Sequence, residues 1–200
     1  MAEEKVYSGE VLVKGSRWRD ELGAWPEEQR AAVTARVDEL IAENPQYCDA
    51  GNHTHLCNLF TGLATYEWHL SQGRSEQDAY RLTAEPMWAY VEKGAGVYRT
   101  LVRIPGFFRL FGKLLPRMFE AGSGYGWRHV WHTTDAHRIR FEEAACIYAQ
   151  ILERYGCRRM GCMFCHVDVI NYGSLPGVTF TRRHTLCEDG QACDFLFEKQ

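Results

Sequence analysis

The feature that most constrains the fold is a change of hydrophobic pattern at a glycine-rich segment, residues 122–126. Before it, apolar residues recur at three- and four-residue spacing, which is typical of helices. After it come short stretches rich in Val, Thr and aromatic residues, which are typical of strands, at 127–133, 137–142, 178–186 and 192–198. The sequence therefore predicts an α+β fold, with a helical N-terminal two thirds packed on a small, mainly antiparallel C-terminal sheet.

Start and stop signals define several helices within this frame. Pro26 opens one that ends before Asn44, and Ser75 is a candidate N-cap for another. The expected helices span residues 26–43, 54–71, 75–93 and, between the strands, 143–155. The length suits a single domain, 1–200, with a mostly helical part over 1–120 and an α/β part over 121–200.

Composition excludes some classes of protein. The net charge of −3 does not point to nucleic acid, and no apolar run approaches the roughly 18 residues of a membrane span. The acidic N-terminus lacks the apolar core of a signal peptide. We expect a cytoplasmic protein that binds neither nucleic acid nor membrane, and a homo-oligomer is left open. The basic and aromatic segment 98–119 is expected to be an amphipathic helix or a lid, with membrane binding as an alternative.

Eight cysteines are more than packing requires in a reducing compartment, so metal binding or catalysis gains weight. The spacing Cys157-x4-Cys162-x2-Cys165, with Cys193 further on, matches plant-type [2Fe–2S] proteins. The bulky residues between these cysteines argue against a cluster. Zinc is an alternative, in which Cys162 and Cys165 supply one thiolate pair and Cys187, Cys193, His166 or His184 completes the four ligands. Cys162, Cys165 and Cys193 are the first candidates. No cofactor is expected otherwise.

Hydrolysis by a thiol is the third interpretation. Cys165 is a candidate nucleophile, provided that a cation or an imidazole lowers its pKa. His166 and His184 are candidate bases, and Arg182 is a candidate cation. Asp168 lies three residues after Cys165, where one helical turn would bring it alongside to act as a general base or to orient another group.

The C-terminal part also resembles a known family. The order Phe141-x4-Cys146-x-Tyr148, Gly156, Cys165-x2-Asp168, Arg182-x2-Thr185-Leu186 and Gly190-x2-Cys193-Asp194-Phe195 is similar to that of the L-2-amino-thiazoline-4-carboxylic acid hydrolase family. The resemblance implies hydrolysis of a cyclic amidine-type thiazoline through an N-carbamoyl intermediate. The ending also resembles, more distantly, small-molecule-binding domains of the four-vinyl-reductase type.

The resemblance suggests roles for individual residues. Cys146, Cys165 and Cys193 are the family's recurring thiols, and Asp168, Asp194 and Arg182 its recurring charged residues, whereas Cys187 lies outside the pattern. We therefore expect a small-molecule hydrolase whose substrate carries a carboxylate, with a metal- or ligand-binding sensor as the alternative. The expected catalytic residues are Cys165, Asp168, Cys146, Cys193 and His184, and the expected substrate-binding residues are Arg182, Asp194 and His166.

Overall fold

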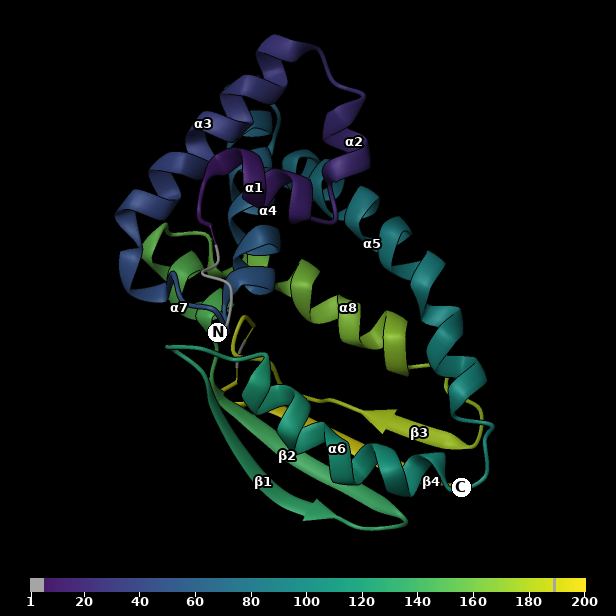
Figure 1. The fold of residues 1–200 in the computed structure, drawn as a ribbon. Coiled ribbons are helices and arrows are strands. Elements are labelled where there is room, and N and C mark those ends of the chain that lie inside the picture. The colour runs from purple at the N-terminus through teal and green to yellow at the C-terminus, as the bar shows by residue number, and fades with distance from the viewer. Residues whose placement is uncertain (1–5, 189) are drawn as a thin grey trace. The chain divides into compact units, whose positions relative to one another are not determined.

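The computed structural model describes residues 6–188 and 190–200 (Figure 1). The chain divides into two compact units, Met1–Tyr90 and Val91–Gln200. Each unit is described by itself below. The single domain expected over 1–200 stays a prediction.

The first unit is helical. Two of its helices confirm the segments predicted at 26–43 and 54–71. A third helix begins as predicted after Ser75, whose Oγ accepts the Asp78 N–H at 3.1 Å, but it extends beyond Lys93. The helices are α1 (Gly9–Gly15), α2 (Arg19–Gly23), α3 (Glu27–Glu43), the short η1 (Pro45–Tyr47), α4 (His53–Ser71) and the first part of α5 (Glu76–Leu101).

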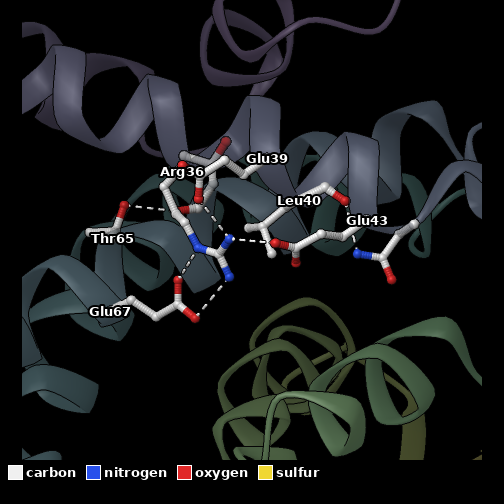
Figure 2. Close-up of polar contacts among 8 residues, drawn as sticks. Arg36, Glu39, Leu40, Glu43, Thr65 and Glu67 are labelled. Atoms are coloured by element: carbon white, nitrogen blue, oxygen red, sulfur yellow. Dashed lines mark hydrogen bonds and ion pairs between the residues drawn. The ribbon is translucent and has the colours of Figure 1, made fainter.

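A charge network joins α3 to α4 in this unit (Figure 2). The guanidinium of Arg36 donates to Glu67 on α4 at 2.7 Å and to Glu39 and Glu43 on α3 at 2.9 and 3.1 Å. These carboxylates, Glu67 first, raise the pKa of Arg36. The network lies at the edge of an apolar contact between the two helices, in which Val33, Val37 and Leu40 are buried.

The second unit contains the sheet. Four antiparallel strands lie in the order β1-β2-β4-β3, as predicted for a small antiparallel sheet. Its elements after the end of α5 are α6 (Phe107–Ala121), β1 (Arg128–Thr134), β2 (Arg138–Ala145), α7 (Ile147–Arg154), η2 (Arg158–Gly161), α8 (Cys162–Tyr172), β3 (Val178–Thr181) and β4 (Cys193–Lys199). The α+β class is confirmed.

One face of the sheet is buried beneath α6 and α8 (Figure 1). Phe111 of α6 and Tyr172 of α8 both contact Phe197 edge-on, at ring-centroid distances of 6.0 and 5.2 Å. Because side chains alternate along a strand, every second residue of β2 and β4 points to this face. The residues that face each other there are Ile139 and Phe197, Phe141 and Phe195, and Glu143 and Cys193.

Two sequence predictions are corrected by this unit. Glu143 does not begin a helix, because it pairs with both β1 and β4 within β2, and α7 starts only at Ile147. The strand expected over 178–186 ends at Thr181. The helical turn considered for Cys165 and Asp168 is present, since both residues belong to α8.

The basic segment 98–119 is interrupted rather than continuous. Helix α5 ends at Leu101 and α6 begins at Phe107, after Gly106 adopts a left-handed conformation with φ of 81°. The buried residues Phe108 and Leu115 of α6 belong to the same apolar cluster as the sheet. Within the part of the chain that the structure describes, no helix has the length and hydropathy needed to cross a membrane.

Candidate functional site

A cluster of thiols lies where α8 meets the start of β4. The half-buried Cys165 lies next to the side chains of Cys187, Cys193 and Thr185, which influence its pKa. The hydrogen bonds from the two thiols, followed by the charge of Arg182 and the hydroxyl of Thr185, lower the pKa of Cys165 although burial opposes this. The arrangement favours a thiolate at Cys165.

The two partner thiols have the opposite character. The pKa values of Cys187 and Cys193 are raised, first because each is hydrogen-bonded to Cys165 and then because each is buried. A neutral thiol can donate a hydrogen bond, whereas a thiolate can only accept one. The cluster therefore consists of one anionic sulfur and two neutral donors.

Local packing holds the two donors in place. Gly161, at the start of α8, leaves room for Cys187, since a Cβ atom on this glycine would lie 2.3 Å from the Cys187 Sγ. The backbone N–H of Leu186 donates to the Cys193 Sγ at 3.2 Å. Gly161 before α8 and the backbone of the connection between β3 and β4 thus position the sulfurs of Cys187 and Cys193.

Cys146 lies close to this cluster and is neutral. It is the N-cap residue of α7 and is buried. Burial first, and then the nearby Cys165 and Glu143, raise the pKa of its thiol to about 12. The structure thus brings together Cys146, Cys165 and Cys193, the three thiols singled out by the sequence.

Arg182 links the thiolate to Asp168. Its guanidinium donates to the Asp168 carboxylate and to the Cys165 backbone carbonyl, both at 2.6 Å, and its side chain is only 7% exposed. It also lies over the ring of Phe195 at 5.5 Å. The sequence predicts that Arg182 binds a substrate carboxylate, and that role stays a prediction; in the structure its carboxylate partner is Asp168.

The remaining expected site residues are Asp194, His166 and His184. The Asp194 carboxylate accepts the backbone N–H groups of Arg183 and His184, at 2.9 and 2.6 Å, and so shapes the connection before β4. His166 and His184 are exposed. Their expected roles in catalysis and substrate binding stay predictions.

A buried carboxylate borders the thiols on the sheet. Glu143 faces Cys193 on one side and His129 on the other, on the same face of three adjacent strands. Its Oε2 lies 2.6 Å from the His129 Nδ1. Burial raises the pKa of Glu143, and the hydrogen bond to His129 lowers it.

A protein-family model matches the part of the chain that contains these residues. The family model for L-2-amino-thiazoline-4-carboxylic acid hydrolase matches residues 71–197. The chain belongs to the L-2-amino-thiazoline-4-carboxylic acid hydrolase family. The match contains the thiol cluster, Asp168, Arg182 and the buried carboxylate. No curated protein and no solved structure matches the chain.

Membership of the L-2-amino-thiazoline-4-carboxylic acid hydrolase family implies a hydrolase, as expected. Over residues 6–188 and 190–200, no group of three or more His, Cys, Asp or Glu side chains is arranged to hold a metal ion. Cys162, Cys165 and Cys193, the ligands expected if a metal is bound, thus do not form such a group. Whether this family member carries zinc stays a prediction.

Sequence reasoning missed several residues of the site in this hydrolase-family chain. Cys187 was placed outside the recurring pattern, yet its thiol contacts Cys165. Thr185 was noted only as part of a motif. Glu143 was assigned to a helix, although the alternation Ile139, Phe141, Glu143 would have placed its carboxylate on the apolar face of a strand.

Proposed function

We propose that this chain opens a small cyclic amidine of the 2-aminothiazoline carboxylate type, with Cys165 as the nucleophile. The observation that carries the proposal is the environment of the Cys165 sulfur, which is surrounded by two thiol donors, a hydroxyl and a buried guanidinium. A thiolate is the strongest nucleophile that a protein offers near neutral pH.

The reaction runs in two steps. The Cys165 sulfur forms a bond to the amidine carbon, the C–S bond of the ring breaks, and the departing substrate sulfur takes a proton. Water then adds to the same carbon and the bond to Cys165 breaks, which leaves an N-carbamoyl product and restores the thiolate. The neutral thiols of Cys187 and Cys193 lie beside the attacking sulfur and are candidate donors of this proton.

Asp168 and Arg182 act together in this proposal. Arg182 holds the Cys165 backbone through the carbonyl oxygen and places a positive charge near the thiolate. Asp168 orients the guanidinium through its 2.6 Å contact. Both are positioning residues, because they act on substrate through Cys165.

Turnover of 2-aminothiazoline-4-carboxylate by the purified chain tests the proposal. Chromatography of the N-carbamoyl product avoids interference from the protein's own thiols. The C165S variant should lose at least about a hundredfold in kcat, because a neutral hydroxyl is a far weaker nucleophile than a thiolate. Cys48→Ser, at a half-buried thiol in the first unit, is the matched control and should retain full activity.

Two results would contradict the proposal. Full turnover by C165S would exclude Cys165 as the nucleophile. Absence of turnover in the wild-type chain, with every thiazoline carboxylate tried, would reject the substrate class. Metal analysis of the active preparation separates the thiol mechanism from the zinc alternative, since one zinc per chain would make the thiols candidate ligands.

A further inference from the structure

A second set of reactive side chains lies next to Glu143, on the side that faces β1 and away from Cys193. The imidazole of His129 bridges Glu143 and Ser123: its Nδ1 lies 2.6 Å from the Glu143 Oε2, and its Nε2 lies 2.9 Å from the Ser123 Oγ. A carboxylate at Nδ1 places the proton on that nitrogen. The Nε2 lone pair is then directed at the serine hydroxyl, which donates to it.

The imidazole is held on all sides. Its side chain is 10% exposed, and that of Glu143 is 5% exposed. Phe119 contacts the ring edge-on at 5.6 Å, and Trp127 stacks on it at 6.1 Å. A fixed tautomer and a fixed ring orientation are what a general base needs in order to act on a neighbouring hydroxyl.

Burial of the Glu143 carboxylate is energetically unfavourable. The second oxygen of Glu143, Oε1, is buried and has no hydrogen-bond partner among the residues that the structure describes. A buried, unsatisfied carboxylate oxygen destabilises a fold, so its retention calls for a reason beyond packing. Orienting His129 toward Ser123 is such a reason.

The serine lies outside the sheet that carries the other two residues. Ser123 is half-buried in the connection between α6 and β1, outside both elements. Gly122 and Gly124 flank it, so neither neighbour adds a side chain beside the hydroxyl. In such a trio the serine is the nucleophile, His129 is the base and Glu143 is the orienting acid.

We propose that Ser123, His129 and Glu143 form a second hydrolytic centre that cleaves small carboxylic esters. The Ser123 Oγ transfers its proton to the His129 Nε2 and forms a bond to the ester carbonyl carbon. The bond from that carbon to the alcohol oxygen breaks, and the alcohol leaves with the proton from His129. Water then gives a proton to His129 and attacks the acyl group, which releases the acid and restores the serine.

The two centres are adjacent yet chemically separate. Glu143 lies between them, since it faces His129 on β1 and Cys193 on β4. Ester cleavage at Ser123 needs neither the Cys165 thiolate nor a thiazoline. The proposal therefore stands or falls independently of the function proposed above.

Labelling of the full chain with a fluorophosphonate tests the serine directly, because activated serines attack the phosphorus of this reagent and displace fluoride in preference to thiols. We expect one label per chain at Ser123, found by peptide mass analysis. In the C165S variant, which lacks the reactive thiolate, we expect cleavage of p-nitrophenyl acetate that the label abolishes. Absence of label at Ser123 in the wild-type chain would overturn the proposal without any variant.

Variants then test the trio as a unit. S123A should lose the label, and H129Q and E143Q should slow labelling at least about a hundredfold, since each removes general-base assistance. Ser174→Ala is the matched control, because Ser174 is an exposed serine that also follows a glycine. It should leave labelling unchanged. Undiminished labelling of Ser123 in H129Q, in protein with an unchanged thermal midpoint, would show that the contacts are structural only.

Discussion

Two arginines, one in each unit, show how the same side chain serves different ends. Arg36 contacts three glutamates and is 24% exposed, whereas Arg182 contacts one aspartate and a backbone carbonyl and is 7% exposed. Around Arg36 the negative charges outnumber the positive one. Around Arg182 a single carboxylate is present, and the Cys165 sulfur lies within its field.

The difference separates a structural charge network from a reactive site. Ion pairs in reach of water contribute little to stability, because solvent screens them and ordering long side chains costs entropy. A buried guanidinium with few partners is unscreened, so it alters the protonation of the groups around it. Exposure and partner count therefore distinguish the two arginines better than residue type does.

The largest expected effect is on the pH dependence of thiol alkylation. Cys165 and Cys48 are both half-buried, but the pKa of Cys165 is lowered by hydrogen bonds from Cys187 and Cys193, whereas burial raises that of Cys48. A lowered pKa keeps the thiolate present as the pH falls. Between pH 8 and pH 5 the iodoacetamide rate at Cys165 should stay nearly constant, while that at Cys48 falls about tenfold per pH unit. Site-resolved mass spectrometry measures both, and parallel profiles would contradict the assignment of the thiolate.

Replacing the buried arginine should have the next largest effect. Arg182→Met removes the ion pair with Asp168, so we expect a loss of about 2–3 kcal/mol in the free energy of unfolding. This is less than the cost of breaking a fully buried pair, because the Asp168 side chain remains 31% exposed. Urea unfolding measures the loss. The alkylation profile of Cys165 should also shift to higher pH. A variant with wild-type stability and an unchanged profile would show that Arg182 does not influence Cys165.

The matched replacement in the first unit should have the smallest effect. Arg36→Met removes contacts to Glu39, Glu43 and Glu67, yet we expect a loss of only about 1 kcal/mol, since all three carboxylates are within reach of water. The same urea titration measures it, with Cys165 alkylation as a second readout that should not change. A loss of unfolding free energy as large as that of Arg182→Met would show that the two arginines do not differ in their contribution to stability.

Local patterns predicted the local structure well. Residues 26–43 and 54–71 carry their own helical spacing and stop signals, and both form helices close to the predicted bounds. Asp168 lies one turn after Cys165 in α8, as the three-residue spacing requires in a helix. These features depend on neighbours in the sequence alone.

Contacts between distant segments could not be predicted in the same way. Cys187 lies beside Cys165 because a turn between β3 and β4 carries it there and Gly161 leaves space for its sulfur. His129 meets Glu143 through the register of β1 on β2, which includes two irregularities that no local pattern specifies. The thiols were found as candidates because their chemistry is distinctive, whereas their partners were missed because only the pairing of strands brings them there.

The register of β4 on β2 couples the formation of the thiol cluster to the formation of the apolar core of the sheet. Sliding β4 by one residue would turn Cys193, Phe195 and Phe197 to the opposite face of the sheet. The apolar cluster and the thiol donor to Cys165 would be lost together. Reactivity at a single sulfur thus reports whether the whole sheet has paired correctly, which makes alkylation of Cys165 a built-in probe of refolding.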